Sequence, residues 1–213
     1  MYMKSLLIST CLLCCSIFAG AQNFSSRFTK VYQACMDLRA ASVTGSASLM
    51  KSACCELKSE DVRYFSTLAC LDDVQLSLNG HFIFDYEFVD SLIVNKSVYR
   101  FAQNYAERSA GRFASTGGRI YIKTCCVAAS SSSRYSFVAQ GHQELAVVSE
   151  GGGLLNLRVY DATNNVWHND DQDLNKGLPS RTRVFDIPGG NALLEIEIIN
   201  KTDKDISFVV LSN

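Results

Sequence analysis

Histidine side chains are the usual general bases near neutral pH, and this chain has three of them: His81, His142 and His168. No two are spaced as the ligands of a metal ion usually are, and the His-Glu-x-x-His motif does not occur. His142 or His168 could still act with a cysteine or an acid from a distant part of the chain. One hypothesis for function is therefore a hydrolase with an interdomain active site.

The serine and cysteine residues provide no recognised nucleophile motif. The Gly-x-Ser-x-Gly sequence, which exposes the serine of α/β hydrolases on a sharp turn, is absent. The tandem pairs Cys54-Cys55 and Cys125-Cys126 have no histidine near them in sequence, and packing or disulfide formation explains them more simply. The sequence therefore predicts no catalytic residue.

Aromatic residues near position 165 indicate a different chemistry. Trp167 is the only tryptophan, with Tyr160 upstream and His168 directly after it. Exposed aromatic rings on a sheet can stack on sugar rings, which makes these three residues candidates for ligand binding in a carbohydrate-binding module. The alternative is that Trp167 plugs the open end of a β-sandwich.

A run of oxygen-bearing side chains offers a candidate calcium site. Asp171, Asp173 and Asn175 stand at positions i, i+2 and i+4, as the first ligands of a calcium loop do. Lys176 occupies the place of the glycine that an EF-hand needs, and Thr182 stands where a glutamate would close the site. A solvated acidic turn is therefore the alternative. No other cofactor is predicted.

The charge balance limits the class of partner. The chain has 20 basic and 21 acidic residues, with a net charge of −1 and no basic run. Nucleic acids and anionic lipids are thereby disfavoured as partners, because their phosphates need a basic surface. The sequence leaves the partner unknown, with a surface glycan or a protein as the candidates.

The first 21 residues have the pattern of a cleavable signal peptide. Lys4 precedes an apolar stretch from Leu6 to Phe18, and Ala19-Gly20-Ala21 fits the small-residue cleavage site. The stretch is too short to span a bilayer, and the bulky residues before Cys15 disfavour a lipidated cysteine. We expect an extracytoplasmic location, in the periplasm, on the cell surface or secreted.

Cleavage would leave an even number of cysteines. The chain has nine, and three of them lie in the predicted signal peptide. The remaining six are Cys35, Cys54, Cys55, Cys70, Cys125 and Cys126. In an oxidising compartment they could form disulfides, but buried free thiols are an equally open interpretation.

Residues 22–115 have mainly helical periodicity. Apolar residues recur at helical spacing from Phe24 to Leu38 and again from Leu49 to Leu57, with Gly45 between the two stretches. Ser59-Glu60-Asp61 resembles a helix start and predicts a third helix through Leu68. Asn79-Gly80 lies between two alternating stretches, so a β-hairpin is expected near 74–89, and a last helix near 98–105.

Residues 119–213 have the alternation of short strands. Inward-facing positions are expected at Leu157, Val159, Leu194, Ile196, Ile198, Phe208 and Val210. Turn residues, Gly141 and Pro188 to Asn191 among them, separate most of the strands. Seven strands are predicted, at Ile120–Val127, Arg134–Ala139, Glu144–Ser149, Leu155–Tyr160, Thr182–Ile187, Leu193–Asn200 and Ile206–Leu211. Short strands at this spacing indicate an antiparallel sandwich of two sheets.

The C-terminal part resembles the bacterial pre-peptidase C-terminal type of β-sandwich, an accessory module of secreted proteins. The likeness lies in the strand Leu155 to Asp161, the acidic Asn169-Asp170-Asp171, and Phe185 to Gly190 leading into Leu194 to Ile198. No protease domain accompanies it here. The resemblance implies a sandwich fold more than a particular role.

These observations predict an α+β protein with three parts. They are a signal peptide (1–21), a helical region with a β-hairpin (22–115) and a jelly-roll-like antiparallel β-sandwich (119–213). The leading functional hypothesis is a secreted bacterial non-catalytic binding or structural module. A hydrolase and a carbohydrate-binding module are the alternatives.

Overall fold

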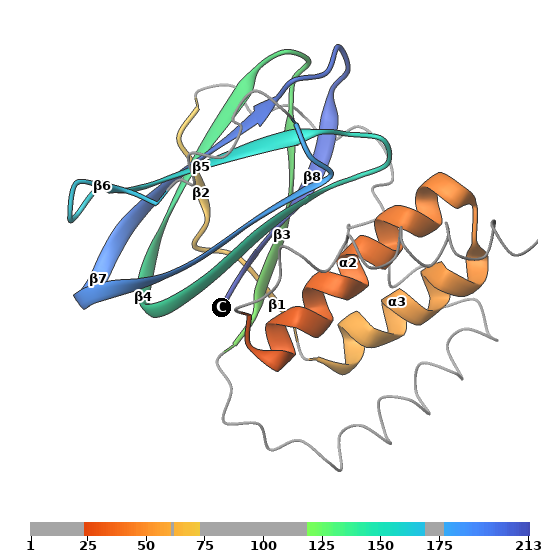
Figure 1. Cartoon of the computed structure of the whole chain (residues 1–213), viewed down its shortest axis with the longest axis horizontal. Coiled ribbons are helices and arrows are strands. Elements are labelled where there is room, and N and C mark those ends of the chain that lie inside the picture. The colour runs from red at the N-terminus through yellow and green to blue at the C-terminus, as the bar shows by residue number, and fades with distance from the viewer. Residues whose placement is uncertain (1–23, 61, 73–118, 169–176) are drawn as a thin grey trace, which may run out of the picture.

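A computed structural model of the chain describes residues 24–60, 62–72, 119–168 and 177–213. These residues form two helices and a mostly antiparallel β-sheet (Figure 1). The strands are β1 (Arg63–Tyr64), β2 (Ala69–Cys70), β3 (Tyr121–Val127), β4 (Ser132–Ser149), β5 (Leu155–Asp161), β6 (Val166–Trp167), β7 (Ser180–Asn200) and β8 (Ile206–Ser212). Their order in the sheet is β1-β3-β8-β4-β7-β5-β6, and β2 pairs with β4 outside this path. Only the short β1–β3 pairing is parallel among these strands.

The helices α2 (Ser26–Thr44) and α3 (Ala47–Ser59) form a hairpin with a very short connection. The side chain of Ser25 caps α2 by accepting from the Phe28 N–H, and Ser46 caps α3 by accepting from the Leu49 N–H. Between them Gly45 has φ +69°, the left-handed conformation that ends a helix at low cost for glycine. Local residue types therefore define both ends of the connection.

Ser25 also attaches α2 to the sheet. Its hydroxyl donates to Oε2 of Glu144 at 2.7 Å, and its N–H donates to Oε1 of the same carboxylate. Glu144 lies in β4 and is only 1% exposed. A buried carboxylate at a helix N-terminus is stabilised by these hydrogen bonds and by the helix dipole.

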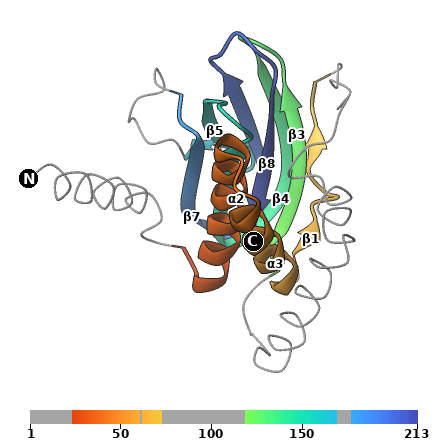
Figure 2. The same ribbon diagram turned by 90° about the vertical axis from the view of Figure 1, so that its right-hand side faces the viewer.

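The helical hairpin covers one face of the sheet (Figure 2). The predicted apolar stripe of α2 is confirmed, because Phe28, Val31, Cys35 and Leu38 are all buried. Together with α3 this stripe packs against Ala146 and Val148 of β4 and Val209 and Leu211 of β8. We call this helix-covered region the outer core.

The opposite face of the same strands forms a second, inner core. All seven residues predicted to face inward lie in it, and each is at most 1% exposed. Strand β8 contributes Phe208 and Val210 to the inner core and Val209 and Leu211 to the outer core. Every residue of β8 is therefore buried, as expected for a strand with both faces covered.

The predicted turns at Gly141 and at Pro188 to Asn191 are wrong as strand ends. They mark the point where two long strands, β4 and β7, bend together: Gln140 pairs with Asn191, and His142 pairs with Asp186. Gly141 has φ +58°, and Gly189 and Gly190 have φ +83° and +119°. A bulge with left-handed glycines turns a strand without ending its pairing, so four of the predicted strands merge into two.

The predicted helix from Ser59 to Leu68 is also wrong. Helix α3 ends at Ser59, and the segment after it forms the short strands β1 and β2, which pair with β3 and β4 and are separated by a turn at Ser66-Thr67. The N–H of Phe65 donates to the Ile122 carbonyl at 2.8 Å, and Phe65 and Leu68 are buried in the inner core. Burial of these two side chains in the inner core outweighs the local preference of the segment for a helix.

Several predictions lie outside the described residues, namely the signal peptide of residues 1–21, the hairpin near 74–89, the helix near 98–105 and the domain boundary near 115. The sheet is not closed, so the jelly-roll-like sandwich stays a prediction. In the described part of the chain no helix is long and apolar enough to cross a membrane.

Candidate ligand-binding surface

A tight connection between β5 and β6 positions the aromatic residues. Asp161 ends β5, and its carboxylate accepts hydrogen bonds from the N–H groups of Thr163 and Asn164 at 3.0 and 2.9 Å. The Asn164 side chain donates to the other carboxylate oxygen at 2.8 Å. This arrangement is an Asx-type turn, which reverses the chain so that Trp167 pairs with Tyr160.

The turn depends on an ionised Asp161, which is 1% exposed. Burial by itself would raise the pKa of this carboxyl group. The hydrogen bonds from Asn164 and Thr163, with His168 nearby, outweigh burial and lower the pKa of Asp161 below its ordinary value. The carboxylate therefore stays charged at neutral pH.

Tyr160 and Trp167 form an aromatic pair on the sheet. Their ring centroids are 4.9 Å apart with planes tilted by 38°. The Arg158 guanidinium lies 4.8 Å from the Trp167 ring centroid, and Arg158 also forms an ion pair with Glu197 at 3.0 Å. Trp167 is 52% exposed, so it does not plug the end of the sheet.

The neighbouring strand extends this surface. Glu195 of β7 lies opposite Tyr160, and its other neighbour is Ser136 of β4. Further along, Val138 and Leu193 face each other across β4 and β7 and are 59% and 41% exposed. We call the set of Val138, Arg158, Tyr160, Trp167, Leu193, Glu195 and Glu197 the aromatic face.

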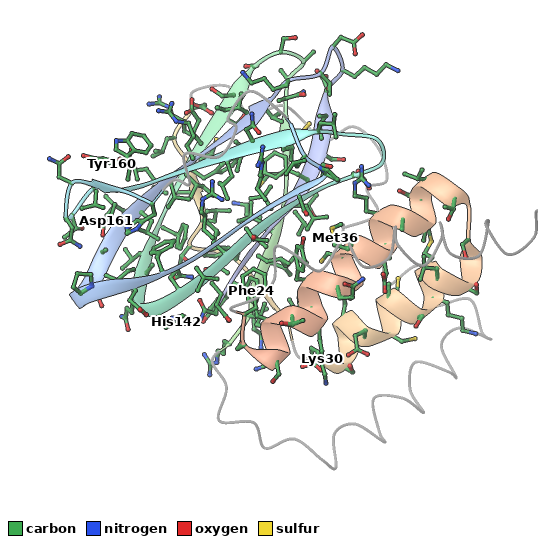
Figure 3. All side chains as sticks on the ribbon, in the orientation of Figure 1. Phe24, Lys30, Met36, His142, Tyr160 and Asp161 are labelled. Carbon is green, nitrogen blue, oxygen red and sulfur yellow. The ribbon has the colours of Figure 1, made fainter. Side chains whose placement is uncertain are left out.

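Strand β6, which carries Trp167, lies at the end of the sheet away from the helices (Figure 1). Figure 3 shows Tyr160 at this end, well separated from Phe24 and Lys30 of the helical side. Two of the three predicted ligand-binding residues, Tyr160 and Trp167, therefore share one exposed surface.

His168, the third predicted ligand-binding residue, lies apart from this surface. Its ring stacks on Phe185 at a centroid distance of 4.0 Å, and its side chain is only 18% exposed. His168 Nε2 lies 3.9 Å from Asp161 Oδ2 and has no hydrogen-bond partner among the described residues. Since successive strand residues point to opposite faces, His168 cannot share a ligand face with Trp167.

His142 lies at the strand bend, away from the aromatic face (Figure 3). Its Nδ1 is 2.8 Å from an Asp186 carboxylate oxygen, and both side chains are largely exposed. Such a pair could orient a general base. Within the described ranges, however, no serine, threonine or cysteine side chain forms a hydrogen bond with His142 or His168.

Three of the described cysteines, Cys35, Cys125 and Cys126, are poorly suited to nucleophilic attack. Burial raises the pKa of the Cys125 thiol to about 12 and raises the pKa of Cys35 further. The pKa of Cys126 is also raised, mainly by burial. These three are free thiols, as is Cys70. A raised pKa keeps the sulfur in the unreactive protonated form.

The calcium candidates Asp171, Asp173 and Asn175 lie outside the described residues. In residues 24–60, 62–72, 119–168 and 177–213, no three His, Cys, Asp or Glu side chains are placed to hold a metal ion. The calcium site therefore stays a prediction.

Sequence reasoning missed Arg158, Val138 and Leu193 as members of the aromatic face. Arg158 could have been placed beside Tyr160, because residues two apart on a strand share a face. Val138 and Leu193 could not, since only the pairing of β4 with β7 and of β7 with β5 brings them near the aromatic pair. Glu195 and Glu197 lie on the outer side of their strand, where they alternate with the buried Leu194, Ile196 and Ile198.

Comparison with known proteins gives partial likenesses only. No protein-family model matches the sequence, and no curated protein matches it. A periplasmic inhibitor of g-type lysozyme from Aeromonas hydrophila is similar over 46% of this chain and 89% of that chain, with 11% identity and a TM-score of 0.31. The corresponding inhibitor from Salmonella Typhimurium covers 46% and 90%, with 13% identity and a TM-score of 0.30. A family two carbohydrate esterase from Cellvibrio japonicus covers 43% and 33%, with 15% identity and a TM-score of 0.23. Each likeness covers less than half of this chain, and at these TM-scores it assigns no function to the chain.

Proposed function

We propose that this chain is a non-catalytic binding module of the extracytoplasmic compartment and that it contacts its ligand with the aromatic face. The observation that carries the proposal is the aromatic pair on the sheet surface, in which Trp167 is exposed and Tyr160 is partly exposed. Large aromatic side chains expose much apolar area to water, and a ligand that covers them gains that area as binding free energy.

Two features of the sequence support the compartment and the role. The predicted signal peptide of residues 1–21 directs the chain out of the cytoplasm. The resemblance of the C-terminal part to pre-peptidase C-terminal sandwiches, which are accessory modules, is consistent with binding rather than catalysis. The jelly-roll-like sandwich is part of this proposal.

Binding to isolated cell envelope tests the proposal. Purified protein lacking residues 1–21 is mixed with insoluble envelope material from the producing organism and sedimented. We expect the protein to sediment with the envelope, and we expect Trp167→Ala to abolish this. Val43→Ala is the matched control, because Val43 is 61% exposed but lies on α2, on the helical side of the molecule.

Two outcomes would contradict the proposal. Wild-type protein that stays in the supernatant would show that it does not bind the envelope. Equal sedimentation of Trp167→Ala and wild type would show that another surface does the binding. A folded far-ultraviolet circular dichroism spectrum of Trp167→Ala is needed for either conclusion.

A hydrolase is the competing function, and the exposed His142–Asp186 pair is the observation that favours it. Purified protein is assayed against ester, peptide and glycoside substrates. Hydrolysis that His142→Ala removes would replace the binding proposal with this one.

A further inference from the structure

The groups on the aromatic face indicate the chemical class of its ligand. We infer that the ligand is an uncharged carbohydrate chain whose pyranose rings stack on Trp167 and Tyr160. This inference rests on the binding role proposed above for the same surface.

The two rings are held in position before any ligand arrives. The Tyr160 hydroxyl donates to Asn165 Oδ1 at 2.7 Å. The Trp167 ring contacts Tyr160 and the Arg158 guanidinium, and Glu197 holds that guanidinium in turn. Side chains that are already ordered lose little conformational entropy on binding. The C–H groups on one face of a pyranose carry partial positive charge and are attracted to the negative face of an aromatic ring.

A polar group without a partner lies beside the rings. Glu195 is directly opposite Tyr160 and is partly exposed. In the described part of the chain, no hydrogen bond or ion pair involves its carboxylate, which can accept two or more. A pyranose that stacks on an aromatic ring with its C–H face points its hydroxyl groups outward from its edge. These hydroxyls are hydrogen-bond donors, so Glu195 can bind a hydroxyl of a stacked sugar.

The distribution of charge favours a glycan over a protein partner. The centre of a protein interface is depleted of charged residues, which are confined to its rim. On this surface Arg158, Glu195 and Glu197 lie beside the aromatic pair. Hydroxyl groups of a sugar can replace the water around these charges, whereas an apolar protein surface cannot.

The sign of the charge favours a neutral glycan. Arg158 and Glu197 neutralise each other as an ion pair, so among the described residues of the aromatic face the remaining charge is that of Glu195. A negative group repels the carboxylates of an acidic polysaccharide. The ligand is therefore expected to lack acidic sugars.

Fluorescence of Trp167 reports directly on this surface, because it is the only tryptophan of the chain. The probes are cellohexaose and chitohexaose, which are neutral, and polygalacturonate, which is acidic. We expect a saturable shift of the emission to shorter wavelength with at least one neutral probe and none with polygalacturonate. A response to polygalacturonate that equals or exceeds the neutral response would overturn the inference.

Two variants test the assigned contacts. Tyr160→Ala should weaken binding of the responding probe by about tenfold, because it removes one stacking ring. Glu195→Gln should weaken it by about fivefold, since a charged acceptor becomes a neutral one with little change of shape. Val43→Ala should bind like wild type. Unchanged affinity in both variants, with unchanged thermal midpoints, would overturn the inference.

Treated envelope material separates this inference from the proposed function. Envelope digested with proteinase K should still retain the protein, whereas envelope whose glycosidic bonds are cleaved with anhydrous trifluoromethanesulfonic acid should not. Retention lost to the protease, or surviving both treatments, would refute a carbohydrate ligand and leave the binding role standing. No retention by untreated envelope would instead refute the binding role itself.

Discussion

At the scale of single residues, Asp161 has the largest structural consequence for the candidate site. It is a buried carboxylate, and its hydrogen bonds to Thr163 and Asn164 shape the turn that brings Trp167 beside Tyr160. A buried ionised group is tolerated only when its oxygens are satisfied, as they are here. The position of the aromatic pair therefore depends on a residue that is not itself exposed.

Replacement of Asp161 should make stability less dependent on pH. The pKa of Asp161 is lower in the folded than in the unfolded protein, where it is about 3.9. Its stabilisation is therefore complete above pH ~4 and is lost as the pH falls through the folded-state pKa. We expect Asp161→Asn to lower the unfolding free energy by about 1–3 kcal/mol at pH 7, and the difference to shrink below pH ~4.

Urea unfolding between pH 3 and pH 7 measures this difference. Asp186→Asn is the control, because Asp186 is 83% exposed and should change stability little. A difference between wild type and Asp161→Asn that stays constant across this pH range would show that the charge of Asp161 is not what stabilises the turn.

At the scale of elements, the joint bend of β4 and β7 organises the sheet. Before the bend β4 pairs with β2, and after it β4 pairs with β8, while β7 remains its partner on the other side. The rings of Tyr135 in β4 and Phe208 in β8 meet at 6.1 Å in the inner core. The bend therefore lets one pair of strands line two regions of the same core.

Gly141 should be needed for this bend. Its φ of +58° is unfavourable for any residue with a Cβ atom, although the space around it is open. We expect Gly141→Ala to destabilise the protein by about 1–2 kcal/mol through backbone strain alone. Gly152→Ala is the matched control, because Gly152 also has open space but no left-handed φ.

Thermal unfolding of the two alanine variants isolates the effect of the left-handed conformation, because an added Cβ meets no neighbour at either site. Gly152→Ala should leave stability unchanged or raise it by up to about 1 kcal/mol. If both variants lose stability equally, the left-handed conformation of Gly141 is not the cause.

At the scale of the whole molecule, strand β8 belongs to both the outer core and the inner core. Strand β8 is buried on both faces, so consecutive residues Val209 and Val210 belong to the outer and the inner core. The buried Glu144 also joins β4 to the start of α2. Loss of packing in one core should therefore also destabilise the other core.

Alanine at these two adjacent positions tests that coupling. Val209→Ala and Val210→Ala should each lower the unfolding free energy by about 1–3 kcal/mol, because both side chains are fully buried. Both variants should keep a single unfolding transition in calorimetry, shifted to lower temperature. Two separate transitions, with Val209→Ala affecting only one, would mean that the helices and the sheet unfold independently.

The sequence by itself determined the local elements of this protein. The spacing and type of the residues predict the helical stripe from Phe28 to Leu38, the end of the helix at Gly45 and the inward-facing residues of the strands. Each of these features depends on neighbours within a few positions. These features need no knowledge of distant contacts.

The tertiary structure decided which strands meet. A turn signal at Gly141 is the same in sequence whether the chain reverses or merely bends, and only the continued pairing with β7 distinguishes the two. Phe65 and Leu68 gave a helical pattern, yet the inner core draws them into extended chain. Likewise, Val138 joins Leu193 and the aromatic pair only through pairings between segments far apart in sequence. Residue type and spacing determine local conformation, but a binding surface made from several strands depends on their register, which long-range packing selects.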